Sequence, residues 1–259
     1  MYTKVLITGA NSYIATLCMP GLDFGNAEIF FVTRSPFEAK NLFLGIQVNC
    51  LVIKDFKEAG TMERLQSFLQ LNPDDRVLII NFIGNFGSIG SIDSLRVENT
   101  GYEINENLLP FLVLAKLISK CEIGLLLTFA GAGIGGDNLE TSSLSYLASK
   151  ASIVVLVEAL DNVLRGNGIR VGGVSPGAFP SRMQEIVAES LDTKAVSNQR
   201  RENAVSTLGM DTDPSKLIRM LNFLCQNPDL AGGRIWSANF DSPVLCDLEP
   251  NFGKIRRVH

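Results

Sequence analysis

Short apolar runs alternate along this chain with longer segments of helical period, and this alternation constrains the fold more than any other feature. It is typical of β-α-β units around a parallel sheet, whose strands are buried on both faces. We predict strands near residues 3–8, 28–33, 48–53, 76–82, 123–129, 169–174 and 234–238. We predict helices over roughly 12–22, 36–44, 57–70, 101–120, 143–165 and 213–227, with a further helical piece around 180–192.

No linker, internal repeat or low-complexity block interrupts this order, and 259 residues suffice for one large core. The fold class that follows is α/β: one Rossmann domain over residues 1–259, with a doubly wound parallel sheet of about seven strands flanked by helices. The exception is a polar, weakly periodic stretch at about 190–213, which indicates a mobile flap or a pair of short helices. We take residues of about 180–213 together as a substrate flap.

Composition excludes several classes of partner. The net charge of −4 offers no basic field for a nucleic-acid backbone. The apolar runs are far shorter than the roughly 20 residues that cross a bilayer, so we expect no membrane partner. The strand pattern begins at Lys4, which leaves no room for a signal peptide, and we expect a cytoplasmic protein.

The cysteine and histidine content limits the kinds of catalytic and metal site that this sequence can form. The cysteines are odd in number and scattered, which favours reduced thiols; they stand at positions 18, 50, 121, 225 and 246. The one histidine is the last residue, His259, so the sequence excludes an internal Ser-His-Asp triad and predicts no metal site. Chemistry must therefore come from Tyr, Lys, Ser, Asn, carboxylates or a cofactor.

Doubly wound sheets bind ligands at the carboxyl ends of their strands. The first strand ends in a turn, Thr8-Gly9-Ala10-Asn11-Ser12-Tyr13-Ile14-Ala15, whose backbone N–H groups could hold a pyrophosphate. The alternative is an ordinary strand-to-helix turn with Asn11 or Ser12 as its N-cap.

The second strand ends in Thr33-Arg34-Ser35, where an NAD site would carry an acid for the ribose. Arg34 could instead neutralise a 2′-phosphate, which favours NADP over NAD, although a lone Arg at a strand end is often only solvated. After the third strand, Asp55 is either an acceptor for an adenine amino group or an acid of the next helix turn.

Two further strand ends carry candidate ligand contacts. The fourth strand ends in Asn81-Phe82-Ile83-Gly84, where Asn81 could pin neighbouring strands and Gly84 would let the backbone approach a ligand. The sixth leads into Ser175-Pro176-Gly177-Ala178-Phe179-Pro180-Ser181, a defined turn where a nicotinamide ring would rest, with Ser181 able to bond its carboxamide.

The most informative pair is Tyr146 and Lys150 at the start of the helix after the fifth strand. A spacing of i, i+4 places phenol and ammonium on one helix face. A free phenol has a pKa near about 10, but a neighbouring cation favours the phenolate. The pair therefore indicates an acid/base of the kind that transfers a hydroxyl proton alongside a hydride.

Taken together, these motifs resemble the short-chain dehydrogenase/reductase family over about residues 3–240. Tyr146 and Lys150 match its Tyr-x-x-x-Lys, Asn107 falls where the family has a helix Asn that anchors a proton-relay water, and Pro176 to Ser181 match its Pro-Gly-x-x-x-Thr. The implied catalytic residues are Tyr146, Lys150 and Asn107. The implied cofactor contacts are Gly9, Asn11, Ser12, Tyr13, Ile14, Thr33, Arg34, Asp55, Asn81, Ile83, Gly84, Tyr146, Lys150, Pro176, Gly177, Phe179 and Ser181.

The resemblance implies an NADP- or NAD-dependent oxidoreductase, with NADP preferred, that interconverts an alcohol and a carbonyl on a small molecule. The segment Leu126 to Gly133 and the tail Gly233 to Ala238 are similar to members associated with bacterial surface-polysaccharide biosynthesis, which implies a sugar or sugar-nucleotide substrate. Family members usually pair through the helices near 101–120 and 143–165, so a homodimer or homotetramer is expected.

The sequence departs from the family pattern at two places. Tyr13 and Ala15 replace two turn glycines, and the Tyr side chain either reshapes the turn or swings aside. The family serine that bonds the substrate oxygen falls at Gly133 by counting and at Ala130 by resemblance; Thr128, Asn138, Thr141 or Ser142 could replace it. These departures favour the alternative reading, a binding or regulatory protein with little or no turnover.

Overall fold

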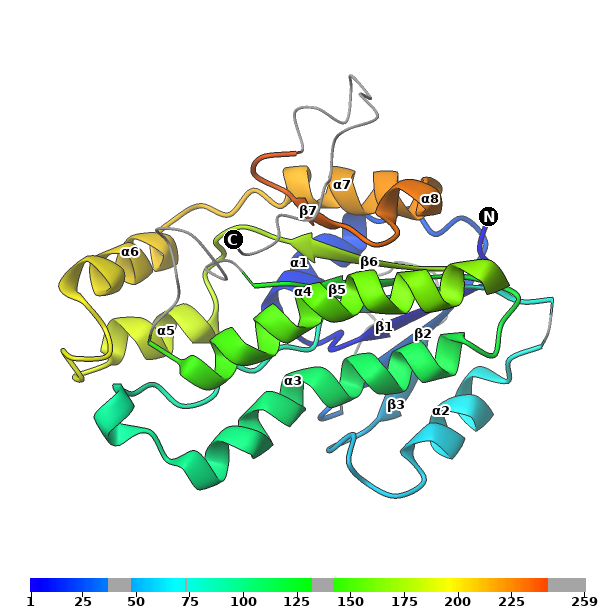
Figure 1. The fold of residues 1–259 in the computed structure, drawn as a ribbon. Coiled ribbons are helices and arrows are strands. Elements are labelled where there is room, and N and C mark those ends of the chain that lie inside the picture. Colours follow the sequence, from blue (N-terminus) through cyan, green and yellow to red (C-terminus); the bar gives the residue numbers. More distant parts are fainter. Residues whose placement is uncertain (37–47, 73, 132–141, 242–259) are drawn as a thin grey trace.

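The computed structural model describes residues 1–36, 48–72, 74–131 and 142–241. Its centre is a parallel sheet of seven strands in the order β3-β2-β1-β4-β5-β6-β7, so the predicted α/β fold with a doubly wound sheet is confirmed (Figure 1). All seven predicted strands are present. They are β1 Lys4–Thr8, β2 Glu28–Thr33, β3 Val48–Val52, β4 Arg76–Asn81, β5 Ile123–Phe129, β6 Ile169–Ser175 and β7 Ile235–Ser237.

Helices connect the strands much as predicted. They are α1 Tyr13–Cys18, α2 Thr61–Leu69, α3 Val97–Ile118, α4 Leu144–Leu164, α5 Arg182–Glu189, α6 Asn198–Leu208, α7 Ser215–Gln226 and α8 Pro228–Ala231, with 3₁₀ turns η1 Met19–Gly21, η3 Ile92–Ser94 and η5 Arg165–Asn167. The expected helix over 36–44 falls almost wholly on 37–47, outside the described residues. The polar stretch contains one short helix, α6, instead of the pair, and α6 packs on α5, which ends just before the stretch.

The helix α3 begins four residues before the predicted start, at Val97, and runs through Gly101. Glycine weakens a helix locally, but the apolar face that follows packs Phe111, Leu114 and Ile118 against the sheet. Tertiary packing stabilises the whole helix and overrides the local propensity of its first turn.

Two hydrophobic layers sandwich the sheet, and alternate strand residues supply one layer each. In β1, Val5 and Ile7 pack on the side of α1 and α7, whereas Leu6 packs on the side of α2, α3 and α4. Figure 1 shows α3 and α4 side by side in front of the sheet and α1 behind it. Because both faces are covered, the ligands of such a fold enter at the carboxyl ends of the strands.

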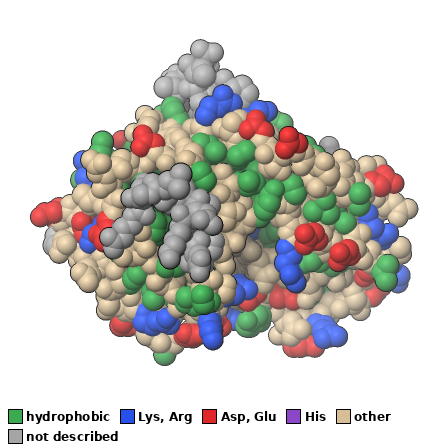
Figure 2. Space-filling view, turned by 180° about the vertical axis from the view of Figure 1, so that it is seen from behind, with side chains coloured by type: hydrophobic (Ala, Val, Ile, Leu, Met, Phe, Trp, Pro, Cys, Tyr) green, Lys and Arg blue, Asp and Glu red, His purple; other side chains and the backbone are tan. Residues whose placement is uncertain are grey.

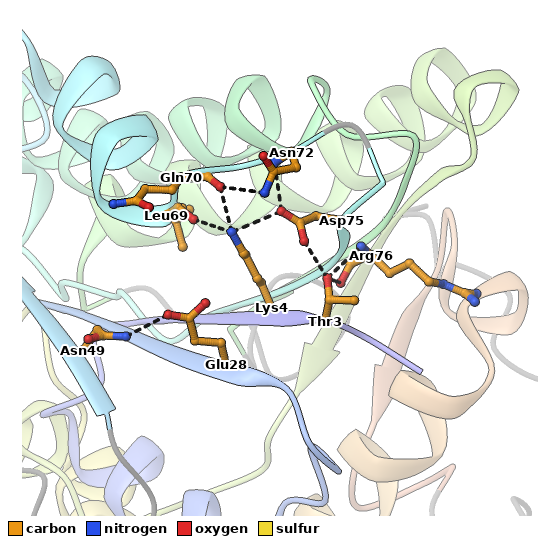
Figure 3. Close-up of polar contacts among 9 residues, drawn as sticks. All are labelled: Thr3, Lys4, Glu28, Asn49, Leu69, Gln70, Asn72, Asp75 and Arg76. Atoms are coloured by element: carbon orange, nitrogen blue, oxygen red, sulfur yellow. Dashed lines mark hydrogen bonds and ion pairs between the residues drawn. The ribbon is translucent and has the colours of Figure 1, made fainter.

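The opposite, amino-terminal end of β1 is tied to α2 by a buried lysine (Figure 3). Lys4 Nζ donates to the carbonyl oxygens of Leu69 and Gln70, at 2.8 and 2.7 Å, and forms a 3.1 Å ion pair with Asp75. Gln70 ends α2 with a φ of +46°, the one positive φ of a non-glycine residue in the described ranges. The ammonium therefore satisfies terminal helix carbonyls and fixes α2 on the sheet.

Candidate active site

The turn after β1 contacts the segment after β4 at Gly9. This residue has a φ of +67°, and a Cβ added to it would stand 3.0 Å from the backbone nitrogen of Ile83 and from the carbonyl carbon of Phe82. A side chain is therefore excluded by both conformation and space. The glycine keeps the turn after β1 in contact with the segment after β4, at the point where the sheet order reverses.

Asn81 pins three neighbouring strands, as its position at the end of β4 suggested. Its Oδ1 accepts from Thr8 Oγ1 of β1 at 2.8 Å, and its Nδ2 donates to Thr128 Oγ1 of β5 at 3.2 Å. The same Oδ1 accepts from the N–H of Ile83 at 3.2 Å. Asn81 and Thr128 are both buried. Thr128 thus serves the strand network, which argues against it as the missing substrate-binding hydroxyl.

The turn after β1 opens α1 with an ordinary N-cap. Ser12 Oγ accepts the N–H of Ala15 at 3.3 Å. Tyr13 has an ordinary negative φ, its side chain is 43% exposed, and it does not line the cavity described below. Of the two alternatives for Tyr13, the side chain swings aside. Ile14 packs its side chain against the core instead of facing the cavity.

A cavity of about 430 Å³ lies beside these strand ends. Eight of the predicted cofactor contacts line it: Gly9, Asn11, Ser12, Thr33, Arg34, Asp55, Ile83 and Gly84. Asn11 Nδ2 reaches Ser35 Oγ at 3.3 Å and so joins the turns after β1 and β2. Asp55 Oδ1 accepts from the N–H of Lys57 at 2.9 Å, and Asp55 also lines the cavity.

Sequence reasoning missed several lining residues. They are Val32, Ser35, Ile53, Lys54, Phe56, Lys57, Phe82, Asn105, Glu106, Leu109, Pro110 and Arg182. Most are direct neighbours of predicted contacts, so the strand ends alone could have suggested them. The residues from α3 have no such signal, because only the packing of that helix brings them to the cavity. Arg182 follows Ser181 of the Pro-Gly turn and is the exposed first residue of α5.

Tyr146 and Lys150 lie on one buried face of α4, whose N-cap Ser143 accepts the N–H of Tyr146. Lys150 Nζ lies 5.6 Å from the centroid of the Tyr146 ring and donates to the carbonyl oxygen of Phe129 at 2.8 Å. Burial lowers the pKa of Lys150 to about 8. A Cβ on Gly84 would stand 3.6 Å from Nζ, so the ammonium lies beside the glycine that also lines the cavity.

The side-chain amide of Asn107 forms three hydrogen bonds that link separate segments of the chain. Its Oδ1 accepts the N–H of Asn85 at 2.7 Å, and its Nδ2 donates to the Asn85 carbonyl oxygen at 2.8 Å and to Ser149 Oγ at 3.0 Å. Ser149 in turn donates to the carbonyl oxygen of Tyr146 at 2.8 Å. The Asn107 side chain thus joins α3, α4 and the segment after β4, and it positions the helix turn that carries Tyr146 and Lys150.

Hydrogen bonds to Glu103 also link α3 to α4 and to the segment after β4. Its carboxylate accepts hydrogen bonds from Ser145 and from Ser88, and the carboxylate of the neighbouring Glu106 accepts from Asn85. Partial burial raises the pKa of Glu103, but the bonds from Ser145 and Ser88 outweigh it, and the net shift is downward. The ionised Glu103 therefore holds the first turn of α4 against the segment after β4.

The Tyr146 side chain is enclosed. Its ring packs on Phe86 with centroids 4.9 Å apart, and both belong to a small apolar cluster with Val187 of α5 and Ala204 of α6. A Cβ on Gly131 would stand 2.5 Å from the Tyr146 hydroxyl oxygen. Gly131 thus lies against the Tyr146 hydroxyl, and it is neither of the two positions expected for the family serine. Ala130 is buried beside it, and Gly133, Asn138 and Thr141 lie outside the described residues.

The predicted contacts after β6 do not line the cavity. Gly177 has a φ of +92° and packs against the side chain of Asn239, Phe179 lies in the core, and Ser181 is the N-cap of α5. Pro176 precedes this turn. The structure therefore brings together the contacts from β1 to β4 in one cavity, with Lys150 at its edge, and the turn after β6 reaches that cavity through Arg182.

Within the described ranges, no group of three or more His, Cys, Asp or Glu residues is arranged to hold a metal ion. A search of the same part of the chain finds no helix with the length and apolar character of a membrane span.

No family model and no curated protein sequence matches this chain. Several solved structures do match it. A short chain dehydrogenase/reductase from Saccharomyces cerevisiae aligns at 19% identity over 96% of this chain and 100% of its own, with a TM-score of 0.77. L-Sorbose reductase from Gluconobacter frateurii, solved with NADPH and L-sorbose, aligns at 18% identity over 92% and 95%, with a TM-score of 0.71. Aldohexose dehydrogenase from Thermoplasma acidophilum aligns at 15% identity over 92% and 94%, with a TM-score of 0.69. The likeness shows a shared fold.

Proposed function

We propose that this protein is an NAD(P)(H)-dependent oxidoreductase of the short-chain dehydrogenase/reductase family that interconverts an alcohol and a carbonyl. One observation carries the proposal: Tyr146 and Lys150 form a buried pair, and Lys150 Nζ lies beside Gly84, which lines a cavity formed by the ends of four strands or by the segments that follow them. Eight of the predicted cofactor contacts line this cavity together with four cationic side chains, which supports a nicotinamide dinucleotide as its ligand.

The chain's own residues have separable roles. Tyr146 is the acid/base that gives or takes the hydroxyl proton, and Lys150 favours its phenolate and binds the nicotinamide ribose. Asn107 holds the turn of α4 that carries both and supports the proton relay. The dinucleotide, when bound, supplies or accepts the hydride.

NADP is the proposed cofactor in preference to NAD. Arg34, at the end of β2, lines the cavity and makes no hydrogen bond or ion pair with the described residues, so its guanidinium is available to a 2′-phosphate. Lys54, after β3, lines the same wall. Asp55 is the proposed acceptor for the adenine amino group.

The proposed substrate is a sugar, with a sugar nucleotide as the narrower form. Two of the similar structures are named for enzymes of sugars, L-sorbose reductase and aldohexose dehydrogenase, which supports this class without specifying a member.

We further propose a homodimer or homotetramer paired through α3 and α4. The cysteines in the described part of the chain are free thiols, which supports the cytoplasm as its location.

A second candidate is a binding or regulatory protein on the same fold. The contact between Gly131 and the Tyr146 hydroxyl favours it, because a glycine offers no hydroxyl to a substrate oxygen. Loss of one such donor costs an enzyme on the order of a hundredfold or more in rate.

Titration with NADPH and NADH, followed by turnover assays over a panel of aldoses, ketoses and sugar nucleotides, separates the two. The proposed function predicts dinucleotide binding and turnover that Tyr146→Phe abolishes while the affinity for NADPH and the fold stay nearly unchanged. Binding without turnover on any substrate favours the second candidate. Full turnover in Tyr146→Phe removes this residue from the mechanism.

A further inference from the structure

The cavity gathers positive charge in a chain that is negative overall. Four cations line it, Arg34, Lys54, Lys57 and Arg182, against two acids, Asp55 and Glu106, whereas the whole chain carries a net charge of −4. On the outer face shown in Figure 2, basic and acidic side chains are interspersed. A concentration of one sign in a concave site attracts a ligand of the opposite sign.

Three of these cations come from one side of the cavity. Arg34, Lys54 and Lys57 follow β2 and β3, the strands at one edge of the sheet, and Lys57 Nζ lies 3.6 Å over the ring of Tyr102. Arg182 is different, because it follows β6 on the other side of the switch point and begins α5. The cations of this one cavity thus come from segments on both sides of the switch point.

Arg182 is not used by the protein itself. Its side chain is exposed, and within the described residues it makes no hydrogen bond or ion pair. The two arginines of α6, by contrast, form hydrogen bonds within the protein: Arg200 donates to Gln184 Oε1 at 3.1 Å and Arg201 to the carbonyl oxygen of Val196 at 3.0 Å. The guanidinium of Arg182, with several donors in one plane, is free to bind an anion that enters the cavity.

The turn after β1, which lines the same cavity as Arg182, has a reduced capacity to hold phosphate. Two of its N–H groups have partners inside the turn, since Ser12 N donates to the carbonyl oxygen of Gly9 at 2.9 Å and Ala15 N to Ser12 Oγ at 3.3 Å. The helix that follows, α1, has only six residues, and Tyr13 and Ala15 stand where the resembled family has glycines. A doubly charged diphosphate in this turn therefore needs a further source of positive charge.

We propose that Arg182 supplies that charge: it binds the diphosphate of the dinucleotide within the cavity that it lines together with Gly9 and Ser12, and so sets affinity for every diphosphate-linked cofactor regardless of its 2′-substituent. This inference rests on the proposed function, since it requires a dinucleotide in the cavity. It assigns Arg182 and Arg34 to different phosphates of one ligand, Arg182 to the diphosphate and Arg34 to the 2′-phosphate.

Calorimetric titration of the full-length protein tests the assignment with four ligands: NADPH, NADH, ADP-ribose and 2′-AMP. Arg182→Ala should weaken NADPH, NADH and ADP-ribose by a similar factor of about ten, equivalent to about 1.4 kcal/mol, and leave 2′-AMP unchanged. Arg34→Ala should weaken NADPH and 2′-AMP and leave NADH and ADP-ribose unchanged. Arg182→Lys, which keeps the charge but loses the planar fork, should recover part of the loss.

Arg219→Ala is the matched control, because it removes the same charge from an exposed position of α7, outside the cavity, and should change none of the four affinities. The inference alone is overturned if the wild type binds dinucleotides and Arg182→Ala binds them equally well, or if that variant loses affinity only for ligands with a 2′-phosphate. A wild type that binds neither dinucleotide overturns the proposed function and this inference together. Thermal unfolding of each variant shows whether an affinity change reflects a loss of fold.

Discussion

The Tyr146 hydroxyl lies so close to Gly131 that a methyl group on Gly131 would stand 2.5 Å from its oxygen and 3.0 Å from the ring carbon that bears it. These residues sit on α4 and just after β5, and the missing side chain of one makes room for the functional group of the other. The absence of a side chain at Gly131 therefore lets the buried Tyr146 adopt its place.

Gly131→Ala should displace Tyr146 and lower the free energy of unfolding by about 1–3 kcal/mol, because the core around the ring has no room for the methyl group. Turnover should fall with it if the protein is an enzyme. Urea unfolding and steady-state assays measure both effects. Gly101→Ala is the control, because a Cβ there meets nothing within 4 Å, and the change in a helix should be neutral or stabilising. A Gly131→Ala protein as stable as the wild type would contradict the close packing of Gly131 against Tyr146.

Arg34→Ala should remove the preference for NADPH. In the wild type NADPH should bind more tightly than NADH by roughly 1–3 kcal/mol, the range for charge-assisted hydrogen bonds. In the variant the two affinities should converge, with the value for NADH unchanged as the internal control. Fluorescence titration measures both. Equal affinities in the wild type, or a preference that survives in Arg34→Ala, would exclude Arg34 as the residue that selects the cofactor.

The low pKa of Lys150 has a consequence for stability. Burial lowers it to about 8 from an ordinary value of 10.5, so between these values the unfolded chain binds a proton that the folded protein has released. Stability of the wild type relative to Lys150→Met should therefore rise with pH from about 8 to 10, by up to about 1.4 kcal/mol per unit. Urea unfolding of both proteins at several pH values isolates this residue, since other groups titrate alike in each. A constant difference would contradict the prediction.

Lys4→Met should lower the free energy of unfolding by about 2–4 kcal/mol, because it leaves two helix carbonyls and the Asp75 carboxylate without their cation. Chemical denaturation at pH 7 measures the loss, and Lys120→Met, at an exposed site after α3, is the control. If Lys4→Met unfolds at the same denaturant concentration as the control, the contacts of Lys4 do not contribute to the stability of the fold.

The same contact should depend on pH at the acid end. Burial raises the pKa of Asp75, but hydrogen bonds from Asn72, Lys4 and Thr3 outweigh it and hold the pKa below the ordinary 3.8. A depressed carboxyl pKa stabilises the fold above its unfolded value, and this contribution is lost as the pH falls through the folded value. The difference between the wild type and Lys4→Met should therefore shrink below about pH 4.

The order of strands and helices, and with it the edge of the sheet where a ligand binds, was determined by local sequence. Alternation of apolar runs with helical segments is a property of neighbouring residues, and it placed all seven strands. The i, i+4 spacing of Tyr146 and Lys150 likewise needs only a helix to put both on one face. Strand ends located eight residues that line the cavity and that are predicted cofactor contacts, because parallel strands share one carboxyl edge.

Contacts between distant segments were decided only by the tertiary structure. No local pattern shows that Gly131 abuts Tyr146, that Asn107 uses its whole amide on Asn85 and Ser149, or that Arg182 reaches a cavity built by β1 to β4. Each depends on how helices and turns from opposite sides of the sheet pack, which sets side-chain direction and distance. Tyr13 illustrates the same limit: its identity left two outcomes open, and the packing of α1 on the core turned the phenol outward.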